Sequence, residues 1–311
     1  MYFCNKTQNM KRIFISLFAA LTAISSFSQE EEDKPKDGWT KSGNFSLLFN
    51  QAAFNAEWTG GGTSNIAGNI SLTYDVNYRK GKLTWDNRFM GDYGLTKIKG
   101  DDFERKTNDR LEINSVLGYQ INETNWAYSF FTNFRTQFAK GYDFDDSTNP
   151  VTRIETTRFM SPGYLQFGPG MLWKKSDNLK VNIAPATSRM IFVNSRYTDV
   201  GNDPAAIEAF NLSPYFGVEA NETMRFEFGA SVSGYAKFDL VENVTMENIL
   251  NLYSNYLEDP QNVDIDYIMN MVLKVNDYLS ANVIFQAIYD DNAVKGFQIR
   301  EVLGIGLNYK L

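Results

Sequence analysis

The sequence predicts an all-β fold: a transmembrane, antiparallel, up-and-down β-barrel of about 12 strands that follows a cleaved signal peptide. Three observations predict it. Apolar and polar side chains alternate along most of the chain, the alternating segments run to roughly 11–17 residues, and the links between them are alternately short and long. Strands of soluble domains usually have about 5 or 6 residues, whereas a tilted strand that crosses a bilayer needs about 9 to 11.

Composition narrows the class of protein. Of the 311 residues, 15% are aromatic, and the mean hydropathy is -0.36. The chain is therefore too polar for a helical membrane protein and too aromatic for a disordered one. The formal net charge is -7 and the sequence shows no basic stripe, which argues against nucleic acid as a partner, because phosphates need a positive footprint.

The first residues, 1–28, have the pattern of a secretory signal peptide. Lys11 and Arg12 precede the apolar run 13–27, and small residues lie where a signal peptidase would cleave, after Ser28. The run is short for a helix that spans a membrane, and an acidic segment follows it. We therefore expect an exported protein, located in the cell outer membrane.

Cleavage would change the composition of the mature chain. It would remove Cys4, the single cysteine, together with three basic residues, so that the charge becomes -10 (-7 minus 3). Residues 29–42 are then expected to form an acidic periplasmic linker. Residues 43–311 are expected to form the barrel, in contact with outer-membrane lipids.

The strand assignment follows the period of two. In residues 263–275 the odd positions are apolar, whereas the even positions include Asp264, Asp266 and Lys274, as in a strand with one apolar and one polar face. The strands predicted in this way lie near residues 44–54, 63–79, 83–99, 107–120, 126–139, 159–174, 179–193, 223–238, 243–254, 263–276, 279–290 and 298–311.

The links between these strands alternate in length. Short links fall at 79–82, 121–125, 174–178, 239–243 and 276–279, whereas the longer set includes 140–158 and 194–222. Short periplasmic turns and longer outer loops, with an even number of strands, are typical of bacterial outer-membrane barrels.

Two strands carry further signals. The last one, 298–311, ends the chain on an apolar face, as the terminal strands of outer-membrane barrels do. In the strand 179–193, Pro185 predicts a bulge or an early break, because proline cannot donate a hydrogen bond to the ladder.

A glycine run at 60–62 raises the question of a phosphate-binding loop. Such a loop needs a lysine and a hydroxyl after its glycines, and it must open a helix. Here Thr63 and Ser64 lead into an alternating strand without a lysine. The glycines are expected to form a turn in the first outer loop, with Trp58 at the membrane interface.

The same region carries a resemblance. The segment 50–100, with its Trp-x-Gly-Gly-Gly element and the Lys-x-Thr-Trp-Asp-Asn element at Lys82–Asn87, is followed by the segments 106–120, 217–230 and 251–267. Together they resemble a family of uncharacterised outer-membrane β-barrel proteins common in Bacteroidetes, a domain of unknown function, over residues 38–311. The resemblance implies an outer-membrane barrel and no particular activity.

The residues required for several kinds of catalysis and metal binding are absent from the sequence. The chain has 0 histidines, and the mature chain would lack cysteine, so serine–histidine and cysteine catalysis and the usual zinc sites lose a required group. Paired acids occur at Asp101-Asp102, Asp145-Asp146 and Asp290-Asp291, but neighbours on a strand point to opposite faces, so solvated acids are expected rather than a catalytic pair. The loop 141–149 is rich in oxygen ligands but lacks the glutamate and glycine of an EF-hand. We expect no enzyme and no cofactor.

The inward face holds the remaining candidate residues. The side chains expected to line the lumen are Asp75, Asp86, Arg88, Asp92, Arg110, Glu112, Arg135, Arg225, Glu227, Asp264, Asp266, Lys274 and Arg300. Charges of both signs allow two interpretations: a ladder of ion pairs that fills a narrow barrel, or a passive narrow channel for small solutes, which we favour. The alternative function is an accessory or structural subunit that docks an outer-membrane partner through loops 140–158 and 194–222.

Overall fold

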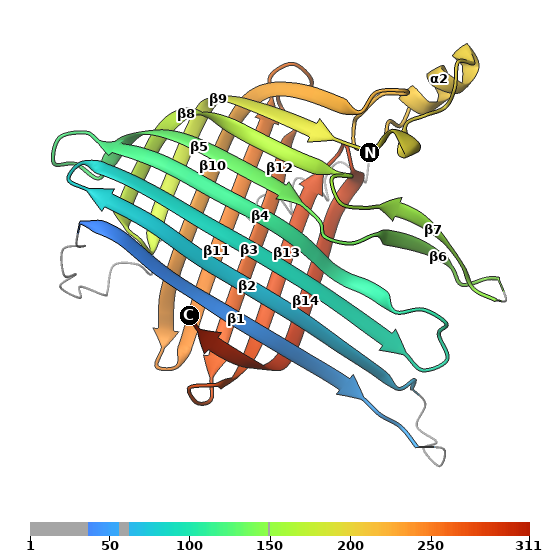
Figure 1. The fold of residues 1–311 in the computed structure, drawn as a ribbon, viewed down its shortest axis with the longest axis horizontal. Helices are drawn as coiled ribbons and strands as arrows, with labels where there is room; N and C mark the ends of the chain where they lie inside the picture. The colour runs from blue at the N-terminus through green and yellow to red at the C-terminus, as the bar shows by residue number, and fades with distance from the viewer. Residues whose placement is uncertain (1–36, 56–61, 149) are drawn as a thin grey trace, which may run out of the picture. The chain divides into compact units, whose positions relative to one another are not determined.

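The computed structural model describes residues 37–55, 62–148 and 150–311, and in them twelve antiparallel strands close into a barrel (Figure 1). Around the ring the order is β1-β14-β13-β12-β11-β10-β9-β8-β5-β4-β3-β2. The barrel strands are β1 (Gly38–Ala52), β2 (Asn65–Lys80), β3 (Leu83–Ile98), β4 (Arg105–Gln120), β5 (Trp126–Thr136), β8 (Gly163–Ser176), β9 (Leu179–Phe192), β10 (Met224–Val241), β11 (Val244–Asn255), β12 (Val263–Lys274), β13 (Leu279–Asp290) and β14 (Val294–Lys310). The predicted fold class is confirmed.

Elements outside the barrel lie in the two longest links. The link 140–158 contains the hairpin of β6 (Gly141–Asp145) and β7 (Thr152–Thr157), so the oxygen-rich loop is largely a strand and its turn. The link 194–222 contains the 3-10 helix η2 (Ser195–Tyr197) and the helix α2 (Pro204–Asn211), which Asp203 caps by accepting a hydrogen bond from the Ala205 amide. No helix of the described residues is long and apolar enough to cross a membrane.

One boundary differs from the prediction. β1 begins at Gly38, which pairs with Arg79, so residues 38–42 belong to this strand and not to the linker. Only Trp39 on this stretch is a large apolar residue, which leaves little alternation to detect. The predicted signal peptide, most of the linker and Trp58 lie outside the described residues.

The outward face is apolar. Large side chains on every second residue are 40–65% exposed, among them Ile70, Phe89, Phe130, Phe226 and Leu307. A monomer rarely exposes so large an apolar patch to water, whereas the wall of a barrel in a bilayer requires one.

Aromatic side chains gather on this face near the short links. The Trp39 ring lies 5.0 Å from that of Tyr78 and 5.9 Å from that of Trp85. The Trp85 indole donates to Ser115 Oγ at 2.8 Å, and Ser115 donates to Asn87 Oδ1 at 2.8 Å. Such rings, apolar in body and hydrogen-bonded at one edge, are typical of the boundary between lipid and water.

The bulge predicted at Pro185 is confirmed, and the strand does not break there. β9 pairs Ala184 with Ser231 and Thr187 with Gly229, so its residues 185 and 186 oppose one residue of β10. The neighbouring strand accommodates the bulge with glycine, since a Cβ on Gly168 would lie 2.4 Å from the Ala186 carbonyl oxygen. The extra residue exchanges the two faces of β9, which turns Arg189 inward.

Candidate lumen and vestibule

Charged side chains fill the middle of the barrel in tiers that follow one another along its axis. Two contacts cross the full width of the lumen. Arg110 of β4 donates to Asp266 of β12 at 2.9 Å, and Arg88 of β3 donates to Glu247 of β11 at 3.0 Å. In each case the two strands lie six places apart in a ring of twelve, on opposite walls. We call Arg88–Glu247 and Arg110–Asp266 the bridging pairs.

Each bridging pair has further partners. Asp266 also accepts from Arg135 at 2.5 Å and from Gln286 at 3.1 Å, and Arg110 donates to Glu112 at 2.6 Å. Such multiple hydrogen bonds are what buried charges require, because an unpaired ion is costly in a medium of low dielectric constant.

Arg88 is held in the same way. It makes two hydrogen bonds to Asp75, at 2.7 and 3.1 Å, and lies 4.4 Å from the centre of the Tyr235 ring. Tyr235 itself donates to Glu247 at 2.7 Å, which closes the group.

Two more tiers lie on either side of the bridging pairs. Toward the long links, Arg189 donates to Glu227 and Asp264, both at 2.5 Å, and Arg225 donates to Glu227 at 2.8 Å. Glu227 is fully buried. Toward the short links, Asp86 accepts from Lys174 at 2.7 Å and from Lys180 at 2.9 Å.

The structure thus brings together ten of the thirteen predicted lumen residues. These are Asp75, Asp86, Arg88, Arg110, Glu112, Arg135, Arg225, Glu227, Asp264 and Asp266. Asp92 lies opposite Ser71 on the neighbouring strand and forms no ion pair among the described residues, and Arg300 lines a cavity described below. Lys274 lies at the short-link end, half exposed, beside Asp277.

Sequence reasoning missed Arg189, Glu247, Lys174 and Lys180. Arg189 was hidden by the bulge, and reading the alternation of β9 separately on each side of Pro185 would have placed it inward. Lys174 begins the short link 174–178 and Lys180 follows it by two residues. Lysines next to a short turn are expected to be solvated, so nothing in the sequence indicated that they point into the lumen.

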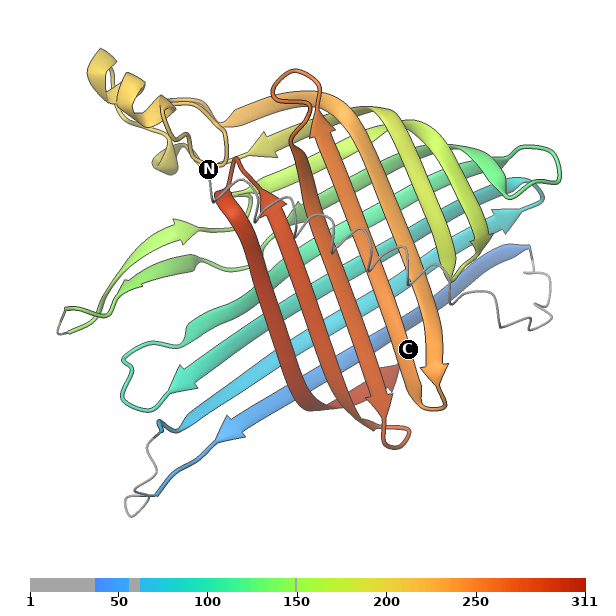
Figure 2. The same ribbon diagram turned by 180° about the vertical axis from the view of Figure 1, so that it is seen from behind.

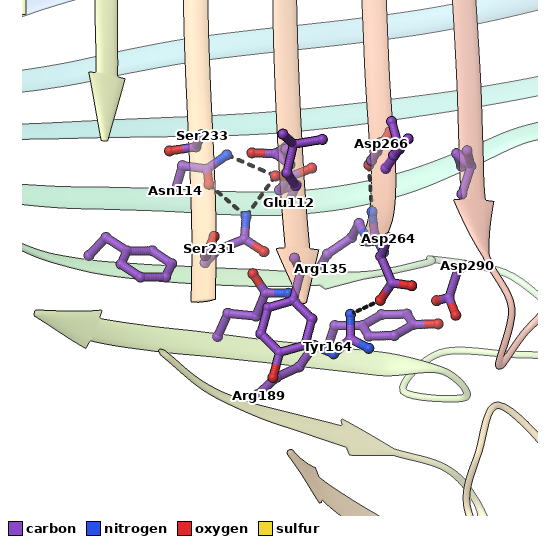
Figure 3. Close-up of a pocket in the computed structure, with 18 of the residues that line it drawn as sticks. Glu112, Asn114, Arg135, Tyr164, Arg189, Ser231, Ser233, Asp264, Asp266 and Asp290 are labelled. Carbon is purple, nitrogen blue, oxygen red and sulfur yellow. Dashed lines mark hydrogen bonds and ion pairs between the residues drawn. The ribbon is translucent and has the colours of Figure 1, made fainter. Parts of the chain in front are cut away.

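Two cavities lie in the barrel. The larger one, the vestibule, has a volume of about 640 Å³ and is lined by Arg110, Arg135, Arg300, Tyr164 and Asp290, among others. The smaller one has about 70 Å³, lies deeper, and is bordered by Glu112, Arg189 and Asp264 (Figure 3). Both cavities are lined by Arg135, Tyr164 and Asp290, so the vestibule leads to the inner cavity. Beyond the inner cavity, the tiers of charged side chains limit the free space.

Three acids meet at the edge of these cavities. Carboxylate oxygens of Asp264, Asp290 and Asp291 lie within 4.8 Å of one another. The expectation that Asp290-Asp291 would diverge fails because residues 291–293 form a turn after β13. Arg189 pairs with Asp264 and Asn262 donates to Asp291 at 2.5 Å, so the protein already balances part of this charge.

The two long loops pack against each other through Glu155 of β7. Its carboxylate contacts Lys140 at 2.9 Å, Arg158 at 2.8 Å and the Tyr197 hydroxyl at 2.8 Å. These hydrogen bonds, first those of Lys140 and Tyr197, lower the pKa of Glu155 to about 2. Burial and the bond to Glu155 raise the pKa of Tyr197 to about 12.

This contact predicts how the loops respond to acid. Because the pKa of Glu155 is lower in the folded protein, its stabilising effect is full above the ordinary value of 4.5 and is lost as the pH falls toward about 2. The protection of residues 194–222 against hydrogen exchange, relative to the intrinsic exchange rate at each pH, should therefore fall between pH 4.5 and 2. The Glu155→Gln variant should exchange faster already at pH 7, with the exposed Glu208→Gln as control. Equal exchange in both variants would contradict the role of Glu155.

The geometry and the fold define a closed twelve-stranded β-barrel with an apolar outer wall and a charged interior. Residues 49–142 match the model of a family described as "Protein of unknown function (DUF3078)". This agrees with the resemblance seen in the sequence to a family of unknown function, whereas its Bacteroidetes distribution stays a prediction. No curated protein matches the chain significantly.

Solved structures of similar fold are outer-membrane barrels. The translocator domain of the autotransporter NalP from Neisseria meningitidis has 7% identity and a TM-score of 0.39, over 98% of this chain and 97% of that one. The COG4313 outer membrane channel from Pseudomonas putida F1 has 10% identity and a TM-score of 0.38, over 92% and 99%. The outer membrane phospholipase A from Escherichia coli has 10% identity and a TM-score of 0.32, over 90% and 94%. Likenesses this distant carry no argument about function.

Proposed function

We propose that this chain is an integral outer-membrane barrel that acts as a narrow passive channel for small solutes, restricted by its bridging pairs. The vestibule carries the proposal. It is a cavity of about 640 Å³ with polar and charged walls, and it leads to a second cavity among the ion pairs. A barrel that served only as a scaffold would need no such space.

The charges of the vestibule favour anions. Lys106, Arg110, Arg135 and Arg300 line it, against the acids Asp109 and Asp290. Lys106 is bound to Asp109 at 2.8 Å, and Arg110 and Arg135 are both bound to Asp266. Arg300 keeps N–H groups without a hydrogen-bond partner among the described residues. A cation of this kind at the entrance of a pore raises the local concentration of anions.

The test is conduction by the purified barrel in a planar bilayer. We expect small, fluctuating currents with a preference for anions, and a shift of the permeability ratio toward cations in Arg300→Gln. Arg88 and Arg110 are unsuitable for this purpose, because Arg88 holds a partly buried carboxylate and Arg110 a buried one. The control is Lys274→Gln, which removes one positive charge at the other end of the barrel.

A second function is favoured by the loops. Their contacts through Glu155 give them a defined shape, and they expose Ile154, Phe159 and Leu212 by 74%, 55% and 83%. An accessory subunit would use such a surface to dock a partner. If the folded wild type carries no current, this second function takes precedence, and co-purification after mild detergent extraction tests it.

A further inference from the structure

The contact that closes the barrel is short. β1 and β14 pair through six residues each, from Asn44↔Lys310 to Phe49↔Ile305, whereas β1 and β2 pair through fifteen. Among the described residues, 298–304 of β14 pair with β13 and not with β1. Figure 2 shows β14, in dark red, diverging from β1, in blue, over this stretch.

The main-chain groups of this free edge point toward β1. Leu311 and Gly43 exchange both backbone hydrogen bonds, and the side of bonding alternates along a strand, so Ile299, Glu301 and Leu303 direct their amides and carbonyls to the same side. The Leu303 carbonyl accepts a hydrogen bond from the side-chain Nδ2 of Asn50 at 3.3 Å. Unpaired backbone groups are tolerated in a membrane where they border water or protein, and not against hydrocarbon.

The vestibule reaches this edge. Val294, Ile299 and Arg300 of β14 line it, although the Ile299 side chain is on the outward face and 64% exposed. The cavity is therefore continuous with the outer surface at the free edge. On the outward face of β14, Leu307 and Leu303 are followed by the charged Glu301. A charged side chain on this face marks the outer boundary of the apolar band, so the opening lies near that boundary.

The walls of the vestibule have two characters. The base carries Arg300, whose Nη2 donates to Gln286 at 3.3 Å while its Nε and Nη1 have no hydrogen-bond partner in the described chain. Arg135 lies at the same base. Phe216, Ile288 and Val294 supply apolar surface between this base and the opening. A ligand with an anionic head group and an apolar tail would fit these walls, with its head at the cationic base and its tail along the apolar surface.

We propose that the free edge of β14 is a lateral entrance, through which an amphipathic anion passes from the outer leaflet into the vestibule. The ligand is a carboxylate or phosphate on a single alkyl chain, and its head binds Arg300 and Arg135. This inference goes beyond conduction of small solutes, because the binding it describes is measurable even in a barrel that carries no current.

The first experiment measures equilibrium binding to the protein in a detergent-free amphipol, with radiolabelled dodecanoate and dodecyl phosphate as probes. About one equivalent should bind. Arg300→Gln should weaken binding roughly 10-fold or more, since it removes a charge-assisted hydrogen bond, while Lys274→Gln should leave it unchanged. The two probes distinguish a carboxylate head from a phosphate head. Acetate and dodecanol should bind far more weakly.

The second experiment tests the entrance. In a Cys4→Ser background, Ile299→Cys is modified with a bulky, membrane-soluble maleimide. The control is Phe226→Cys on β10, four places away in the ring and also exposed on the outward face. Modification at 299 should slow dodecanoate uptake at least several-fold, and modification at 226 should not. Both variants must show the heat-dependent gel shift of a folded barrel.

Three results would overturn the proposal. Equal binding of acetate and dodecanoate would reduce the vestibule to a simple anion site, and equal binding by wild type and Arg300→Gln would indicate adsorption to the outer wall. Equal uptake after modification at 299 and at 226 would mean that the ligand enters through the mouth of the barrel on the side of the long links. None of these results depends on whether the barrel conducts.

Discussion

Glu227→Leu should lower the free energy of unfolding of the barrel by about 3–5 kcal/mol. The carboxylate is fully buried and accepts hydrogen bonds from Arg189 at 2.5 Å and from Arg225 at 2.8 Å. Its loss leaves two guanidinium groups with one partner fewer in a confined space, where water cannot replace the carboxylate.

The measurement is equilibrium unfolding in urea, with the protein in lipid vesicles. The control is Asp277→Asn, which breaks the exposed pair with Lys274 and should cost about 0–1 kcal/mol. Similar small losses in both variants would show that the tier around Glu227 is hydrated. A hydrated tier would in turn strengthen the case for an open pore.

Local patterns in the sequence were sufficient for the wall of the barrel. Side-chain period and link length are properties of neighbouring residues, so both faces of β12 and the alternation of short and long links were predictable. Pro185 also predicted the bulge, whereas the inward position of Arg189 depends on the exchange of the two faces of β9 after it.

The contacts across the lumen could not be predicted in the same way. Arg110 and Asp266 are 156 positions apart in the sequence and meet because twelve strands close with one particular stagger. Alternation shows that both side chains point inward, but it does not show at which height each one lies. The same reason hides the short β1–β14 contact, since β14 reads as a continuous strand along its whole length.

The bridging pairs set the resistance of the pore in the proposed channel. These two pairs join strands six places apart in the ring, and Asp266 also binds Arg135 from five places away, whereas Asp86 and Lys174 lie on strands three places apart. Removal of both bridging pairs should therefore widen the path far more than removal of the Asp86–Lys174 pair. The change in net charge is zero in both cases, so the comparison isolates the obstruction.

We therefore expect a severalfold rise in single-channel conductance when Arg88, Glu247, Arg110 and Asp266 are all replaced by serine. The matched control replaces Asp86 and Lys174 by serine, and it should conduct nearly as the wild type does. The quadruple variant also removes the ion-pair partners of Asp75, Glu112 and Arg135, which costs stability. It must therefore show the heat-dependent gel shift of a folded barrel before its conductance is compared. A folded quadruple variant with wild-type conductance would show that the bridging pairs are not the constriction. If neither barrel conducts, the accessory role becomes the better account of this fold.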